Sequence, residues 1–336
     1  MNHRVLFIGG TGVFGYRLAD HLGYGHAQTP DLDIIITSRR LEKAKRSANL
    51  LRAKHPGYSI SGAALDHRKG LKTLLDNLKP FVVIDCSGPF QKATYDVAKT
   101  VLGAGIHLID LADARDYLKD FAKELGPIAT QHGACGFTGA SSTPTLSSCV
   151  VRHLAANWKR IDTIDICITP GGKSEAGRSV IEAILSYAGE EIITWQNGGI
   201  ALTRGWTKSR LIDIPGLGCR WVSPVETFDA ELLGDMHNVQ SRVSFAAGLD
   251  SLLEQWGINA IAWMRQHKLI PHPSLLIPAL LRMRKITRRY TSDKGAMVVD
   301  ITGINAEGDY ERAQWSLLAE NDHGPFVPIL PAAALI

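Results

Sequence analysis

The sequence predicts an α/β protein in which a doubly wound parallel sheet is joined to a second α+β domain with a mixed or antiparallel sheet. Three observations predict this. A strand, a glycine-rich turn and a helix follow one another at the N-terminus, short apolar segments alternate with helical stretches as far as residue 140, and longer alternating segments occupy the second half. The length of 336 residues fits about two domains. We predict domains at 1–140 and 141–324, followed by a terminal segment at 325–336.

The composition is that of an ordinary folded protein, with 45% hydrophobic and 21% charged residues and a formal net charge of +4. These values exclude a disordered or fibrous chain, and without a nucleic-acid-reading motif they give no reason to expect a nucleic-acid partner. The five cysteines have neither metal-ligand nor disulfide-framework spacing, so we expect no metal and a reducing compartment. No segment has the roughly 20 apolar residues that cross a bilayer, and the first apolar run is too short for a signal peptide, so we expect a cytoplasmic protein.

The first strand, expected at 4–8, ends in glycines spaced as GxxGxxG: Gly9, Gly12 and Gly15. The first glycine allows the turn, the second allows a pyrophosphate to approach the backbone, and the third allows the following helix to pack on the strand. The phosphates would lie at the helix N-terminus, where unpaired N–H groups attract anions. The pattern and its position predict a dinucleotide site; the alternative is a glycine-rich turn without a ligand.

The next strand, expected at 33–37, is followed by Ser38, Arg39 and Arg40 in place of the acidic residue that binds a ribose 2′-hydroxyl. Because a guanidinium offers a planar fork of donors to a phosphate, this predicts NADP, with NAD as the second candidate. Asp33 opens the strand and would lie at the wrong end to replace the missing acid. The alternative is that both arginines only flank a solvated helix.

Three further strands are expected at 58–65, 81–85 and 106–110, with helices around 71–78 and 95–102 between them. Ligands bind such sheets at the carboxyl ends of the strands. This places Asp66 near the adenine, and it places four residues near the nicotinamide: Ser87, Gly88, Pro89 and Phe90. A plain turn explains Gly88 and Pro89 equally well.

After a helix at 116–132 and a strand at 135–139, the segment Ser141, Ser142, Thr143 and Pro144 predicts a second helix start. Thr143 is expected to cap this helix and Pro144 to occupy its first position. The hydroxyls either bind a substrate carboxylate at the helix N-terminus or only cap the helix.

The second half is expected to have strands at 161–169, 241–247, 296–303 and 311–319, and a helix at 179–187. Lys173 and Arg178 in the loop 170–178 either receive carboxylates of a substrate or are solvated loop charges. Residues 252–289 combine tryptophans and leucines with five cations between 282 and 289. Such a segment suits a homodimer interface, which we favour, or peripheral contact with an anionic membrane.

Six segments resemble the saccharopine dehydrogenase-like family, in its bacterial branch of proteins with a saccharopine dehydrogenase NADP-binding domain: GGTGVFG, DCSGPFQKATYDVAK, GIHLIDLAD, GASSTPTLSS, SDKGAMVVDITG and ENDHGPFVPILPA. The resemblance implies a Rossmann domain joined to a mixed α/β domain. It assigns the pyrophosphate to Gly9, Thr11, Gly12, Val13 and Phe14, with Gly10 in the same turn, the adenosine phosphate to 38–40 and the nicotinamide ribose to 87–90. Asp113 and residues 141–143 would face the reacting centre. No catalytic acid is implied, because hydride transfer depends chiefly on positioning.

The function expected from this resemblance is NADP-dependent hydride transfer to or from the C–N bond of a small amino-acid-derived imine or secondary amine. Two alternatives stay open: a non-catalytic dinucleotide-binding protein that associates with a membrane or a partner, and an enoyl reductase that acts on the C=C bond of a lipid-like substrate. The resemblance also implies that a helix beginning at Leu330 returns to the Rossmann domain and that more chain follows. We therefore expect either a short branch of the family or a missing C-terminus.

Overall fold

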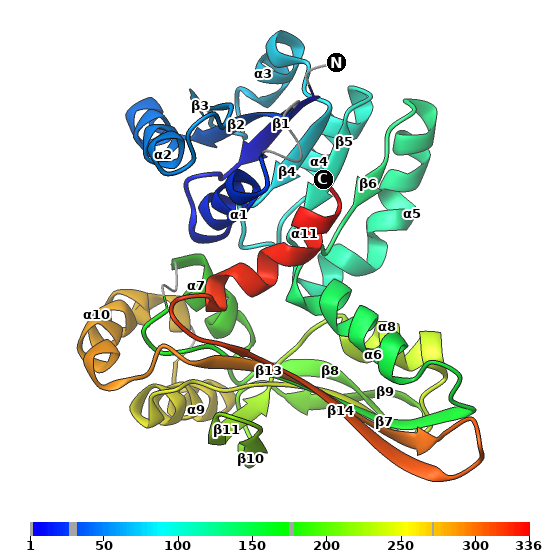
Figure 1. Ribbon diagram of the computed structural model, residues 1–336. Coiled ribbons are helices and arrows are strands. Elements are labelled where there is room, and N and C mark those ends of the chain that lie inside the picture. Colours follow the sequence, from blue (N-terminus) through cyan, green and yellow to red (C-terminus); the bar gives the residue numbers. More distant parts are fainter. Residues whose placement is uncertain (1–2, 27–31, 175–177, 271) are drawn as a thin grey trace. The chain divides into compact units, whose positions relative to one another are not determined.

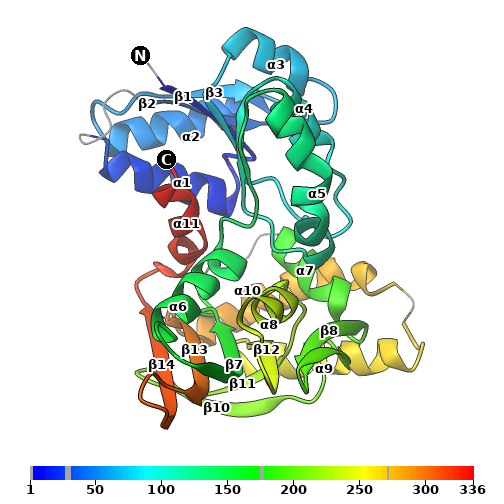
Figure 2. The same cartoon turned by 90° about the vertical axis from the view of Figure 1, so that its right-hand side faces the viewer.

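The computed structural model describes residues 3–26, 32–174, 178–270 and 272–336. The chain divides into two compact units, and each has its own sheet and its own hydrophobic core (Figures 1 and 2). Unit 1 comprises Met1–Ser142 together with Pro325–Ile336, and unit 2 comprises Thr143–Gly324. Among the described residues, no helix has the length and apolar character needed to cross a membrane.

Unit 1 contains a six-stranded sheet in the order β3-β2-β1-β4-β5-β6, in which every pair of neighbours is parallel. Its strands are β1 (His3–Ile8), β2 (Leu32–Ser38), β3 (Ile60–Ala64), β4 (Val82–Asp85), β5 (His107–Asp110) and β6 (Gly136–Phe137). The direction of winding reverses between β1 and β4, and ligands of doubly wound sheets bind at such a point, outside the carboxyl ends of the strands. The predicted doubly wound parallel sheet is confirmed.

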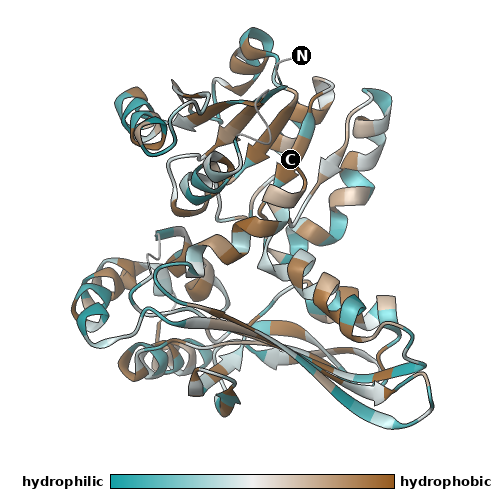
Figure 3. Cartoon of the chain, in the orientation of Figure 1, coloured by the Kyte–Doolittle hydropathy of each residue, from teal (hydrophilic) through white to brown (hydrophobic). Residues whose placement is uncertain are grey.

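Helices cover both faces of this sheet. They are α1 (Val13–Tyr24), α2 (Leu41–Lys54), α3 (Leu71–Leu78), α4 (Asp96–Gly103), α5 (Arg115–Gln131) and α11 (Leu330–Ala334). The helices α1, α2 and α11 lie on one face, and α3, α4 and α5 lie on the other (Figure 1). The strands are hydrophobic over most of their length (Figure 3). Ile329 and Ala332, from the end of the chain, are fully buried in the same core as Phe7 and Ile36.

Unit 2 is built on a mixed sheet in the order β10-β11-β12-β7-β13-β14, and β8 pairs with both β12 and β9. The strands are β7 (Arg160–Thr169), β8 (Glu191–Gln196), β9 (Gly199–Arg204), β10 (Arg210–Ile214), β11 (Gly218–Pro224), β12 (Arg242–Ala247), β13 (Gly295–Ile304) and β14 (Tyr310–Ala319). β12 and β7 run parallel, and the other pairs are antiparallel. The second sheet is therefore mixed, as the sequence predicts.

The helices of unit 2 bury two separate apolar clusters. They are α6 (Ser147–Leu154), α7 (Arg178–Tyr187), α8 (Asp229–His237), α9 (Leu252–Gln266) and α10 (Ile277–Thr287). The 3₁₀ turn Pro273–Leu276 precedes α10, and the 3₁₀ turn Arg288–Tyr290 follows it. Val151 of α6 and Leu233 of α8 pack on the sheet with Val299. The helices α7, α9 and α10 meet in a second cluster around Ile258 and Ile277.

The structure confirms the helix start predicted at Thr143 and Pro144. Thr143 is extended, with φ −128° and ψ 134°, as an N-cap residue is, and helical backbone follows from Pro144, first as a wide π turn to Leu146 and then as α6 from Ser147. The Ser147 hydroxyl donates to the carbonyl oxygen of Pro144 at 3.0 Å, one turn back, and also hydrogen-bonds the buried carboxyl group of Asp229 in α8. This contact holds the start of the helix against α8.

Candidate functional site

The glycine-rich turn joins β1 to the N-terminus of α1 at the winding reversal of the unit 1 sheet. Gly9 has φ +71°, and a Cβ there would lie 3.0 Å from the carbonyl oxygen of Cys86 and from Cα of Ser87. A Cβ on Gly15 would lie 2.7 Å from the Gly9 carbonyl oxygen. Close backbone packing therefore requires glycine at both positions, and it holds the turn against the loop that follows β4.

The N-terminus of α1 is open to an anion. Gly12 is the N-cap, no side chain caps the helix, and the first turn carries no acidic residue. The first N–H groups of any helix lack partners within it, and here they belong to Val13, Phe14 and their neighbours. With the helix dipole, they make a site suited to a pyrophosphate.

The carboxyl end of β2 carries free positive charge. Arg39 and Arg40 are exposed, and no ion pair holds either guanidinium within the described ranges. The Arg40 backbone N–H lies 3.4 Å from the hydroxyl of Ser38. Asp33, at the other end of β2, accepts hydrogen bonds from Arg4 (3.0 Å) and Ser59 (3.1 Å). The acid is thus engaged away from the site, while both arginines are available to a phosphate.

Asp66 follows β3 and is exposed at the same edge of the sheet. Its Oδ1 accepts a hydrogen bond of 3.2 Å from the backbone N–H of Arg68, which forms a local turn. Together with Lys69, Thr73 and Asn77 it lines a pocket of about 410 Å³. Ala64, Leu65 and Leu74 also line it, so the structure places a pocket of mixed polar and apolar lining beside the residue predicted to approach the adenine.

Two buried carboxyl groups end β4 and β5 side by side, because Asp85 and Asp110 are partners in the parallel register. Asp85 is 4% exposed, and its Oδ1 accepts a 2.8 Å hydrogen bond from the backbone N–H of Ser87. Asp110 is fully buried, and its Oδ1 accepts three hydrogen bonds of 2.8–3.0 Å, from the Thr138 hydroxyl and two backbone N–H groups. The sequence identified these residues only as strand ends and missed their pairing.

Burial raises the pKa of both carboxyl groups. For Asp110 it raises the pKa to about 7, and the charge of Asp85 adds to the rise, while the three hydrogen bonds lower it. The pKa of Asp85 is raised mainly by burial as well. A carboxyl group with a pKa near neutral pH therefore lies next to Asp85, which bonds the loop that the resemblance assigns to the nicotinamide.

The side chain of Phe90 is buried. It is 6% exposed and packs against Tyr117, with ring centroids 5.2 Å apart. Its ring also lies against Gly88 of the same loop, where a Cβ would lie 3.4 Å from Cδ2 of Phe90. Ser87 and Gly88 are partly exposed, Pro89 is exposed, and Asp113 is exposed and accepts a 3.1 Å hydrogen bond from Gln91.

The remaining predicted substrate residues are divided between the units. Ser141 and Ser142 belong to unit 1, whereas Thr143, Lys173 and Arg178 belong to unit 2. Lys173 is exposed, and Arg178 forms a 2.7 Å ion pair with Glu182 one turn along α7. This ion pair with Glu182 favours the interpretation of Arg178 as a solvated charge. Within the described segments, no three His, Cys, Asp or Glu side chains group in a way that could hold a metal ion.

No family model matches the chain, and no curated protein matches it in sequence. Solved structures do match. The apo saccharopine dehydrogenase (L-Glu forming) of Saccharomyces cerevisiae is 13% identical, with 99% of this chain and 90% of that chain covered and a TM-score of 0.61. A DAP dehydrogenase of C. glutamicum in complex with DAP is 14% identical, with coverage of 97% and 86% and a TM-score of 0.48. The first likeness confirms, at the level of the fold, the resemblance carried by the sequence motifs.

Proposed function

We propose that this protein is an NADP-dependent oxidoreductase that transfers hydride to or from the C–N bond of a small amino-acid-derived substrate. The observation that carries the proposal is the turn from Gly9 to Gly15, whose close-packed glycines and uncapped helix lie at the winding reversal of the sheet. The unpaired charges of Arg39 and Arg40 support NADP over NAD. The fold shared with a saccharopine dehydrogenase supports the C–N bond as the reacting group.

In this proposal NADP supplies the hydride carrier, and the chain supplies its position. The N–H groups that open α1 hold the pyrophosphate, and Arg39 and Arg40 hold the adenosine phosphate. Ser87 and Gly88 would lie beside the nicotinamide ribose, and the backbone of Gly9 approaches Ser87. The carboxyl group of Asp110, with a pKa raised to about 7, lies next to Asp85, which hydrogen-bonds Ser87. Positioning of donor and acceptor accounts for most of the rate in such a transfer.

Gly15→Ala is expected to weaken NADPH binding by at least about tenfold, because its methyl group would push the Gly9 carbonyl out of the turn. Gly126→Ala is the matched control: Gly126 lies in helix α5 of the same unit, and a Cβ there meets nothing within 4 Å. Fluorescence titration with NADPH measures both variants. Equal affinity of parent and Gly15→Ala would contradict the assigned site.

Turnover separates the enzyme from the non-catalytic alternative. We expect NADPH oxidation, followed by absorbance, when the protein is mixed with an amino acid and a 2-oxo acid that form an imine. NADPH binding without oxidation by any imine would favour a non-catalytic protein, and oxidation by an enoyl thioester alone would favour the C=C reductase.

We also propose that a second copy of the chain covers the outer face of α9. Leu252, Trp256 and Trp263 follow one another at helical spacing along this face and are 59%, 49% and 56% exposed. Among the described residues this face carries no cation, whereas Arg282 and Lys285 lie exposed on α10 and Arg289 lies exposed in the 3₁₀ turn after it. An apolar face without charge suits a protein partner better than an anionic membrane.

Trp263→Glu is therefore expected to convert a dimer of 36.6 kDa chains into monomers, as measured by sedimentation velocity. Tyr310→Glu is the control, because Tyr310 is 66% exposed on β14 and lies outside this face. A parent protein that is monomeric but floats with anionic vesicles in a salt-sensitive way would instead support the membrane interpretation.

The five cysteines are all free, which supports a cytoplasmic, reducing location.

A further inference from the structure

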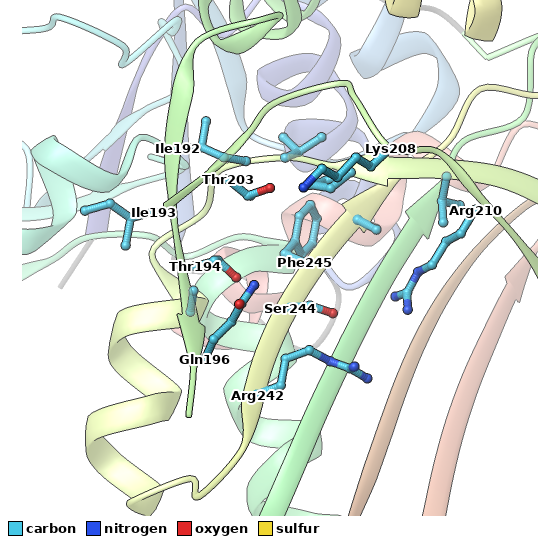
Figure 4. Close-up of a pocket in the computed structure, with 15 residues that line it drawn as sticks. Ile192, Ile193, Thr194, Gln196, Thr203, Lys208, Arg210, Arg242, Ser244 and Phe245 are labelled. Carbon is cyan, nitrogen blue, oxygen red and sulfur yellow. The ribbon is translucent and has the colours of Figure 1, made fainter. Parts of the chain in front are cut away.

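The sheet of unit 2 forks at the edge of β12, and the fork encloses a pocket of about 230 Å³ (Figure 4). One edge of β12 pairs with β7 along its whole length. At the other edge, β8 pairs with Arg242 and Val243, and β11 pairs with Ala246 and Ala247. Ser244 and Phe245 therefore lie where β8 and β11 separate, and the space between these strands is the pocket.

The separation is built into the backbone hydrogen bonding. The backbone N–H of Ile193, where β8 leaves β12, donates to the carboxylate of Glu226 at 3.0 Å. The Thr194 hydroxyl donates to the carbonyl oxygen of Val243 at 3.2 Å. The backbone N–H of Val225 donates to the carbonyl oxygen of Phe245, also at 3.2 Å. Polar groups along the fork are thus satisfied without closing the sheet. The open space is a formed feature of the fold.

The interior of the fork is apolar and its rim is cationic. Ile192, Val222 and Ala246 contribute to the lining and are 1%, 0% and 4% exposed. Three cations also line the pocket, Lys208, Arg210 and Arg242, and no lining residue is acidic. In Figure 4 the Lys208 side chain extends toward Thr203, while both guanidinium groups lie on the side of Ser244.

One carboxylate balances part of this charge from outside the lining. Asp165 accepts from Arg242 at 2.5 Å and from Arg210 at 3.5 Å, and it also accepts from the Ser244 hydroxyl. The ammonium group of Lys208 has no hydrogen bond or ion pair within the described part of the chain. Two of the three lining cations are thus paired with Asp165, and Lys208, which has no partner among the described residues, extends toward Thr203 of the lining.

We propose that this fork binds a small organic anion, whose carboxylate or phosphate group meets Lys208 and Arg210 and whose short apolar part lies against Ile192 and Val222. Charge-assisted hydrogen bonds from both cations would hold the anionic group, and burial of the apolar part would add affinity. The pocket is smaller than the roughly 300–1,000 Å³ of sites for drug-sized ligands, which limits the ligand to a small molecule. The inference rests on unit 2 alone and is independent of the proposed dinucleotide site.

Isothermal titration at constant ionic strength tests both parts of the ligand with four probes: hexanoate, hexyl phosphate, hexan-1-ol and inorganic phosphate. We expect saturable binding of hexanoate or hexyl phosphate, with the tighter one identifying the anionic group. Hexan-1-ol lacks the charge and inorganic phosphate lacks the chain, so each is expected to bind at least about tenfold more weakly. No saturable binding of either amphiphilic anion, or equal binding of hexan-1-ol, overturns the proposal.

The variant Lys208→Gln tests whether the anion binds in the fork. It is expected to weaken binding of the tighter probe by about tenfold. Lys268→Gln is a close control, because Lys268 is also exposed and has φ 59°, near the φ of 49° at Lys208, but does not line the pocket. Equal affinities of parent and Lys208→Gln, or equal losses in both variants, would show that the anion binds elsewhere.

Discussion

Raising the pH from about 4 to about 7 is expected to destabilise unit 1 through Asp110 by about 3 kcal/mol, relative to the same unit with Asp110→Asn. Burial raises the pKa of Asp110 from 3.8 to about 7, so the folded state binds this proton more tightly than the unfolded state does. The stabilising contribution is therefore complete below about pH 4, falls as the pH rises, and is lost above about pH 7. Asparagine keeps the oxygen that accepts the three hydrogen bonds but removes the titration.

The measurement must report on unit 1 alone. All seven tryptophans lie in unit 2, so tryptophan fluorescence would follow the wrong unit. Protection of the β4 and β5 amides against hydrogen exchange, corrected for intrinsic rates, gives the local free energy of unfolding. Asp120→Asn is the control, because Asp120 is exposed on α5 of the same unit. The same pH dependence in parent and Asp110→Asn would show that Asp110 titrates normally.

Replacing Arg39 and Arg40 together by glutamine is expected to lower the affinity for NADPH by about 100-fold and to leave NADH nearly unchanged. Hydrogen bonds to a charged group are worth about 1.5–3 kcal/mol, and 1.4 kcal/mol corresponds to a factor of ten. Neither guanidinium group has an ion pair with any residue that the structure describes, so the variant loses no ion pair seen there. Only a ligand that carries the 2′-phosphate should respond.

Arg46→Gln controls for the general loss of positive charge, because Arg46 is exposed further along α2. Binding of both dinucleotides is measured in parent and variants at one salt concentration, since screening weakens exposed charges. Tighter binding of NADH than of NADPH by the parent would make the predicted preference wrong.

The fold of unit 1 was predictable because its signals are local. β1, β2, β4 and β5 are short, mainly apolar runs that end at a glycine or a polar residue, and the glycines of the first turn lie directly between a strand and a helix. The pairing of Asp85 with Asp110 was not predictable in the same way. It depends on the register of β4 and β5, and on burial that gives Asp110 its raised pKa.

Unit 2 shows what pattern reading overlooks. The hairpin of β8 and β9 turns at Asn197 and Gly198, with φ of 52° and 73°, and such an Asn-Gly pair between alternating residues is a strong signal for a two-residue turn. The hairpin could have been found from the sequence. The fork at β12 could not, because it joins residues from several separate segments, and which edge of β12 each strand pairs with is a tertiary outcome.

The order of synthesis leaves the core of unit 1 incomplete for a long stretch of translation. Ile329 and Ala332 belong to a core whose other members, such as Val5 and Phe7, are made much earlier. All of unit 2, Thr143–Gly324, is translated between them. The apolar surface that Ile329 and Ala332 cover therefore stays open to chaperones until this later segment has left the ribosome.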